Sequence, residues 1–375
     1  MPLVITEEQS MLKTSAKEFL KEKAPVANLR ALRDERSAYG YDPKVWAAMA
    51  EMGWASLTIP EAYGGLDFGY TGLGQILEET GRTLTASPLV STALIGTTLL
   101  NQGANVLQKE ALLPAIAEGK LLLSLATEET QAHKPAVVNA KYRVTSTGFS
   151  ITGTKLCVLD GHVANKLIVS ARKNSKSGIS LFLVDAKAKG VSIERTFMMD
   201  SRNAANITLK SVKVKEPDLI GTEGEGLAIL EKTMDIARIG LAAEMLGTMQ
   251  EAFERTVAYL KERQQFGVPI GVFQGLQHRA AHMYCEIENC KSVVIAALQA
   301  VDADSPKVPM LASLAKAKLG EVLQLVTNEA IQMFGGIGMT DDEEIGFFLK
   351  RARVVQQTLG DYNYHLDRYA KMNGY

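Results

Sequence analysis

The sequence predicts an α+β protein of several domains: an N-terminal helical domain, a middle β-barrel domain and a C-terminal four-helix bundle. A chain of 375 residues is longer than one small hydrophobic core usually holds. Helix-period segments occupy both ends of the chain, whereas its middle consists of short β-branched runs separated by turn residues. We expect the domains to span 1–118, 119–218 and 219–375.

The N-terminal domain is predicted from apolar residues at helical spacing. Segments 7–24 and 43–53 each carry apolar side chains three and four residues apart, and glycine or proline interrupts the pattern. The segment 59–72 (IPEAYGGLDFGYTG) is rich in turn formers and separates two helical stretches. We therefore expect residues 1–118 to be helical with one extended loop.

The middle of the chain has the texture of β structure. Runs such as 121–127, 179–186 and 207–214 are short and rich in β-branched residues, and Gly, Asn, Lys and Asp stand between them. Frequent turns between such runs are typical of a small all-β unit, either a barrel or a sandwich. We expect a barrel.

The C-terminal part returns to helical periodicity. Four long helices are predicted, at about 224–263, 271–302, 307–333 and 341–372. Long antiparallel helices with short links form a bundle.

Composition and charge exclude several classes of protein. Lysine and arginine (41) nearly balance aspartate and glutamate (42), so nothing favours binding to nucleic acid or to an anionic membrane. The N-terminus lacks the features of a secretion signal, and no apolar run is long enough to span a bilayer. The three cysteines form no paired C-x-x-C. We expect a soluble protein of the cytoplasm.

Nucleotide and metal motifs of the common kinds are absent from the sequence. Neither G-x-G-x-x-G after a strand nor G-x-x-x-x-G-K-[ST] occurs, so a nucleotide cofactor would have to be held in another way. His278, His282 and Glu286 share one helix face, but Arg279 stands where H-E-x-x-H needs glutamate. We therefore expect no metal site.

Two stretches in the predicted bundle could contact a ligand. In 261–283 a helix ends near Arg263, a turn follows, and a helix restarts near Phe273; an arginine fork there suits phosphate oxygens. In 331–339 (IQMFGGIGM) the glycines would let the backbone approach a ligand closely. Taken singly, each stretch is better explained as an ordinary helix connection or a helix C-terminus.

Taken together, four motifs resemble the acyl-CoA dehydrogenase flavoprotein family. They are MAEMGWASLTIPEAYGG, GTEGEGL, RQQFGVPIGVFQGLQH and QMFGGIGM. They occur in the family's order and spacing over essentially the whole chain. The chain is similar in particular to divergent members that are subunits of heterotetrameric acyl-CoA dehydrogenases.

The resemblance implies that FAD is the cofactor, lying between the barrel and the bundle and held partly by a neighbouring subunit. Arg263 would pair with the pyrophosphate, and Thr127 would be a flavin contact. The cofactor-binding positions that it implies are Arg263, Phe266, Gln274, Gln332, Gly335, Gly336 and Thr127.

The positions of the catalytic base and of the barrel motif depart from the family pattern. Members of the family use a carboxylate to remove the substrate α proton while a β hydride passes to the flavin. The usual position of that base holds Leu359, and the alternative position, before the arginine of the first bundle helix, holds Ala237. The barrel motif that usually resembles T-E-P-G-S-D is ATEETQAHKP in this chain, without its glycine, serine and aspartate.

Two other carboxylates are candidates for the catalytic base. Glu244 lies seven residues after Ala237, almost two helical turns, so both side chains project from one face. Small residues at 237 and 240 would admit a ligand, although the same stripe fits a polar helix surface with a Glu251–Arg255 pair. Asp361 lies two residues after Leu359.

Three functions remain open. The first is FAD-dependent α,β-dehydrogenation of an acyl-CoA, with Glu244 or Asp361 as base and an electron-transferring flavoprotein as acceptor. The second is a non-catalytic subunit that lends FAD contacts to a related partner in an enzyme for bulky acyl-CoAs, such as steroid side chains or dicarboxylates. The third is a flavin monooxygenase or oxidase on the same fold. The first two imply a homo- or heterotetramer, and the acyl group stays unspecified.

Overall fold

The computed structural model describes residues 3–375, which form two compact units. The bundle unit comprises the chain up to Glu35, Tyr70–Thr85 and Arg238–Tyr375, and the sheet unit comprises Arg36–Gly69 and Ala86–Ala237. The N-terminal helices are thus divided between the two units.

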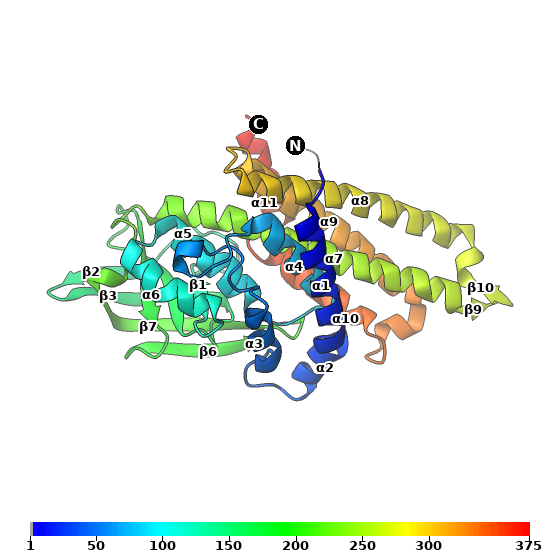
Figure 1. Ribbon diagram of the computed structural model, residues 1–375, viewed down its shortest axis with the longest axis horizontal. Helices are drawn as coiled ribbons and strands as arrows, with labels where there is room; N and C mark the ends of the chain where they lie inside the picture. Colours follow the sequence, from blue (N-terminus) through cyan, green and yellow to red (C-terminus); the bar gives the residue numbers. More distant parts are fainter. Residues whose placement is uncertain (1–2) are drawn as a thin grey trace. The chain divides into compact units, whose positions relative to one another are not determined.

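Five helices of the C-terminal part build most of the bundle unit. They are α7 (Gly226–Glu262), α8 (Gln274–Asp302), α9 (Val308–Phe334), α10 (Ile345–Gln357) and α11 (Tyr362–Met372). The central member is α9, which packs against α8, α10 and α11, and Figure 1 shows the length of α7 and α8. The predicted bundle is confirmed, with helix bounds within a few residues of those expected for the first three helices.

The expected fourth helix, 341–372, is wrong: it is two helices separated by a short loop. Leu359 (φ 59°) and Gly360 (φ 107°) have left-handed backbone conformations that end α10. Asp361 then caps the new helix, because its carboxylate accepts a hydrogen bond of 2.8 Å from the Tyr364 backbone N–H.

Three N-terminal helices belong mainly to the bundle unit: α1 (Glu7–Lys23), α2 (Val26–Asp34) and α4 (Gly69–Arg82). A capping box between Thr6 and Gln9 begins α1. Helices α4 and α7 pack closely through glycines. A Cβ atom on Gly81 would lie 2.0 Å from the Glu244 carbonyl oxygen, and one on Gly247 would lie 1.7 Å from that of Glu78.

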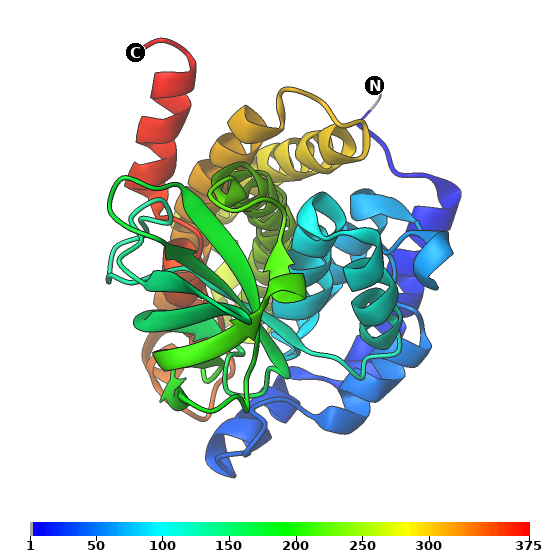
Figure 2. The ribbon, with the colours of Figure 1, turned by 90° about the vertical axis from the view of Figure 1, so that its left-hand side faces the viewer.

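The sheet unit contains eight strands in the order β6-β7-β3-β2-β4-β5-β8, with β1 parallel to β4. Figure 2 looks toward these strands, drawn in green. Their bounds are β1 Leu123–Ala126, β2 Lys141–Thr145, β3 Gly148–Leu159, β4 Lys166–Arg172, β5 Ile179–Asp185, β6 Val191–Phe197, β7 Asn203–Lys215 and β8 Leu219–Ile220.

The predicted β domain is confirmed, but the barrel is not closed. Within residues 3–375, β6 and β8 are the two ends of the hydrogen-bonded order, and β2 meets β4 through the single pair Lys141–Arg172. The interior is held by burial: β4 and β5 are buried along most of their length. Tyr142, Phe149 and Phe182 pack edge to face with ring centroids 5.0–5.6 Å apart.

The remaining helices of the sheet unit are short: α3 (Pro43–Glu51), α5 (Thr97–Gly103), α6 (Val106–Ala117), a π-helical stretch η2 (Leu89–Gly96) and two 3-10 turns, η1 (Glu61–Tyr63) and η3 (Glu216–Asp218). None of the helices found between residues 3 and 375 combines the length and the apolar character that a bilayer crossing needs.

Candidate cofactor and catalytic sites

The first group of predicted FAD positions surrounds the end of α7. After α7, Arg263 leads into a hairpin of β9 (Gln264–Gln265) and β10 (Val268–Pro269). Phe266 stands at the tip of this hairpin, with φ 54° and 91% exposure. The backbone of Arg263 is tied by hydrogen bonds to Tyr259 and Ile270, whereas its exposed guanidinium has no bonding partner among residues 3–375.

Gln274 and the glycine turn after α9 are also accessible to a ligand. Gln274 is exposed as the first residue of α8, and Gln332 is exposed near the end of α9. Gly335 has a φ of 68°, and a Cβ atom on either Gly335 or Gly336 would meet nothing within 4 Å. Unbonded donors and an accessible backbone fit the binding of an anionic cofactor such as FAD. The FAD contacts themselves remain a prediction.

The loop that follows Thr127 in the middle domain carries carboxylates where a phosphate site would need donors. Thr127 is buried, and the loop after it closes on its own carboxylates. Glu128 contacts His133 Nδ1 at 2.6 Å and accepts from the Lys134 backbone N–H at 3.1 Å. Such acceptors already occupy the local N–H groups and would repel a phosphate. This loop therefore does not suit the binding of a phosphate group.

A second carboxylate of this loop faces the interior of the sheet unit. Glu129 accepts from the Asn139 backbone N–H at 2.6 Å and from that of Ala140 at 3.1 Å. It also pairs with the buried Lys155, whose Nζ lies 2.6 Å from Glu129 Oε1. Lys155 Nζ further donates to the Thr127 carbonyl at 3.3 Å. The loop is thus fixed from within by Glu129.

Glu244, a predicted catalytic base, lies in the interior of the bundle unit. It is 1% exposed, and its Oε1 accepts from Arg351 Nη2 at 2.8 Å and Nε at 3.1 Å. Two charge-assisted hydrogen bonds from this guanidinium stabilise the negative charge of the carboxylate. The geometry is that of a buried ion pair on facing helices, and Glu244 as a base stays a prediction.

Asp361, the other predicted base, occupies the N-cap of α11. Beside it, the Leu359 carbonyl accepts from Arg238 Nε and from His365 Nε2, each at 3.0 Å. Arg238 and His365 are almost fully buried. The loop that carries the usual base position is therefore held firmly, but it presents a leucine side chain, and a catalytic role for Asp361 also stays a prediction.

The sequence analysis did not identify two buried cations of the bundle unit, Arg351 and Lys316. Arg351 stands on the apolar stripe of α10, with Phe347 and Phe348 one turn before it and Val355 one turn after. Lys316 of α9 is 2% exposed, and its Nζ donates to the Val355 carbonyl at 2.6 Å. A charged residue within an otherwise apolar helical stripe is the signal that could have pointed to Arg351.

The pKa of Lys316 is lowered from 10.5 to about 7, mainly by burial and further by Arg238 and Arg351, while Asp361 acts in the opposite direction. Between these values the unfolded chain binds a proton that the native chain does not bind. The free energy of unfolding therefore rises with pH across this window, by up to about 1.4 kcal/mol per pH unit.

We expect Lys316→Met to remove that contribution, because methionine carries no titrating group into the core. Urea unfolding at pH values from about 7 to 9.5 measures it as a smaller pH slope in the variant. Lys371→Met is the matched control, since that side chain is 70% exposed. Equal slopes in Lys316→Met and the unsubstituted chain would contradict the assignment.

Comparison with known proteins identifies the family. Three family models match in order: the acyl-CoA dehydrogenase N-terminal domain over residues 6–120, the middle domain over 124–212 and the C-terminal domain over 224–372. The short/branched chain specific acyl-CoA dehydrogenase of Bos taurus is 29% identical, over 98% of this chain and 85% of the relative.

Solved structures agree with the sequence matches. A variant of the Tcur3481-Tcur3483 steroid ACAD is 32% identical, with a TM-score of 0.89 over 98% of both chains. The butyryl-CoA dehydrogenase of Megasphaera elsdenii is 25% identical, with a TM-score of 0.92 over 100% of both chains. The resemblance seen in the motifs is confirmed. The chain belongs to the acyl-CoA dehydrogenase family, whose members are FAD-binding oxidoreductases that act on the CH–CH bonds of acyl-CoA.

Proposed function

We propose that this chain is a subunit of a heteromeric acyl-CoA dehydrogenase that lends FAD contacts to a related partner and does not itself remove the substrate α proton. One contrast carries the proposal. The bundle-side FAD positions are open and unbonded, whereas Glu244 is engaged by Arg351 and Asp361 caps a helix.

In that complex the chain's own residues bind and orient. Arg263 would neutralise pyrophosphate oxygens with a planar fork. Gly335 and Gly336 would let the backbone approach the adenosine side, since no atom obstructs them. FAD, when bound, supplies the acceptor for the β hydride. The partner would supply the base and the barrel-side contacts.

Two observations support a partner of this kind. In the loop after Thr127, the carboxylates of Glu128 and Glu129 already occupy the backbone N–H groups of Lys134, Asn139 and Ala140, so these donors are not free for a phosphate. The steroid ACAD of similar structure bears a paired name, Tcur3481-Tcur3483. We extend the proposal to a heterotetramer that acts on a bulky acyl-CoA, such as one with a steroid side chain, and passes electrons to an electron-transferring flavoprotein.

The test is the visible absorption spectrum of the chain purified alone and after co-expression with a related family member. We expect little flavin in the first sample and stoichiometric flavin in the second. Arg263→Ala should weaken FAD retention by the complex at least about tenfold, because it removes a charge-assisted contact. Arg353→Ala is the control, since Arg353 donates to Asn328 at 3.0 Å and lies outside the FAD motif.

The contrary outcome is a yellow chain, alone and fully loaded, whose flavin bleaches on anaerobic addition of an acyl-CoA. That result would make the chain a complete enzyme. Loss of bleaching in Glu244→Gln with flavin retained would then establish Glu244 as the base, which would require it to part from Arg351.

A further inference from the structure

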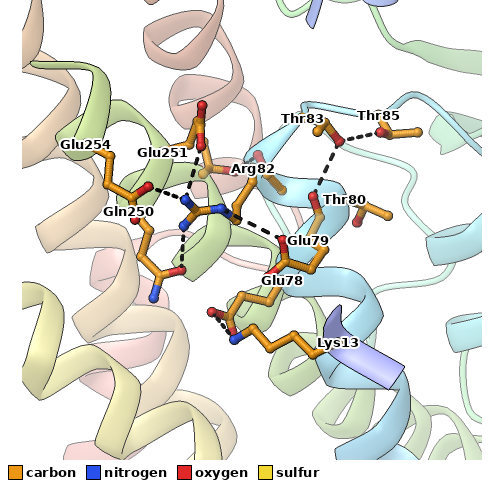
Figure 3. A network of polar contacts seen from close by, with 12 residues as sticks. Lys13, Glu78, Glu79, Thr80, Arg82, Thr83, Thr85, Gln250, Glu251 and Glu254 are labelled. Atoms are coloured by element: carbon orange, nitrogen blue, oxygen red, sulfur yellow. Dashed lines mark hydrogen bonds and ion pairs between the residues drawn. The ribbon is translucent and has the colours of Figure 1, made fainter. Parts of the chain in front are cut away.

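The bundle unit contains a groove of about 760 Å³ between α1, α4, α7 and α8. Its floor is apolar and buried, formed by Leu246, Val294 and Leu298. One wall is polar and comes from α4, whose labelled side chains Figure 3 shows beside Gln250 and Glu254 of α7. The volume lies within the range of small-molecule sites. None of the predicted FAD positions or base candidates lines this groove.

Most charges along the groove are already compensated within the protein (Figure 3). Lys13 pairs with Glu78 at 2.6 Å. Arg82 pairs with Glu254, lies 3.2 Å from Glu251, and donates to Gln250 Oε1 at 3.3 Å. At the rim, Lys291 pairs with Glu288 at 2.5 Å, and Lys17 is exposed to solvent, where its charge is screened.

Lys13, Arg82 and Lys17 all favour the charged form of the Glu79 carboxylate, but none of them donates a hydrogen bond to it. Glu79 is 3% exposed, and the one cation within ion-pair distance among residues 3–375 is Arg82, whose Nε lies 3.8 Å from Oε2. No hydrogen bond to this carboxylate occurs within the described part of the chain. Burial raises the pKa of Glu79 above its ordinary value. The carboxylate borders the groove, where a ligand donor would replace the water that otherwise hydrates it.

Gln75, one helical turn before Glu79, adds a second acceptor. It is 5% exposed and lines the groove. Its Nε2 makes a long hydrogen bond of 3.4 Å to the Thr71 carbonyl, and its Oε1 accepts from no residue between 3 and 375. The polar wall therefore presents two buried acceptors on the same face of α4.

We propose that this groove binds a small molecule that carries a protonated primary amine on an aliphatic body. The ammonium group donates to Glu79 and Gln75, and its charge neutralises the carboxylate. The hydrocarbon packs on Leu246, Val294 and Leu298. A carboxylate ligand would be repelled by Glu79, and an alcohol supplies one donor without charge. This site is separate from the proposed FAD-lending function.

The experiment is isothermal titration calorimetry of the purified full-length chain with 1-hexylamine, 1-hexanol and hexanoate, which share one hydrocarbon body. We expect 1-hexylamine to bind, 1-hexanol to bind at least about tenfold more weakly, and hexanoate not to bind. Glu79→Gln should weaken 1-hexylamine binding at least about tenfold. Glu288→Gln, a rim variant of the same chemistry, should keep the original affinity.

Melting curves and circular dichroism establish that each variant is folded, and Gln75→Leu gives a second test if Glu79→Gln is unstable. Gln75→Leu should weaken 1-hexylamine binding, because it removes one acceptor and leaves the carboxylate. Three results would overturn the proposal: no binding of 1-hexylamine to the unsubstituted chain, equal weakening by Glu79→Gln and Glu288→Gln, or equal affinity for the amine and the alcohol.

Discussion

Replacing Arg351 by methionine is expected to lower the free energy of unfolding by about 3–5 kcal/mol, the usual effect of removing one member of a buried ion pair. The Glu244 carboxylate, 1% exposed, would lose the guanidinium that contacts it at 2.8 Å. Methionine keeps most of the side-chain volume, so the loss reflects charge more than a cavity. Urea unfolding at neutral pH measures the change.

Two further variants test whether the loss of stability comes from the Glu244–Arg351 ion pair. Arg353→Met, two residues along α10, should change stability by less than about 1 kcal/mol, because Arg353 is half-buried and, within residues 3–375, donates only to the neutral side chains of Gln356 and Asn328. The double variant Glu244→Leu/Arg351→Met should recover much of the lost stability, since it removes both buried charges. Full stability of Arg351→Met alone would contradict the assignment of Glu244 and Arg351 to a stabilising buried ion pair.

Gly247→Ala is expected to destabilise the bundle unit by about 1–3 kcal/mol or more through overpacking. The added Cβ atom would lie 1.7 Å from the Glu78 carbonyl oxygen, which is backbone and cannot turn aside. Helix α4 would have to move away from α7. Because α4 carries Gln75 and Glu79, the same variant should also weaken 1-hexylamine binding in the groove.

Gly320→Ala is the matched control for the glycine substitution. Gly320 lies within α9, and a Cβ atom there would meet nothing within 4 Å. This change should stabilise the chain by up to about 1 kcal/mol, because alanine favours helix more than glycine does. Thermal or urea unfolding of both variants gives the comparison. Equal effects of the two substitutions would contradict the proposed close packing of α4 on α7.

Several local features were predictable because short-range spacing determines them. The Glu251–Arg255 pair, expected from i,i+4 spacing on a helix, has an Nε–Oε1 distance of 2.9 Å. The split of 341–372 was missed although Gly360 and Asp361 provide a helix end and a helix start. The apolar periodicity on both sides of these residues outweighed the two capping signals.

The sequence by itself determined the family, the helical and β segments and the positions where FAD contacts are expected, because periodicity and motif spacing are local properties of the chain. Only the tertiary structure determined which partners the buried carboxylates have. Glu244 meets Arg351, 107 positions away, while Glu79 remains without a hydrogen bond in a groove built from four helices. Burial and charge pairing depend on which helices pack together, and spacing within one helix does not encode that.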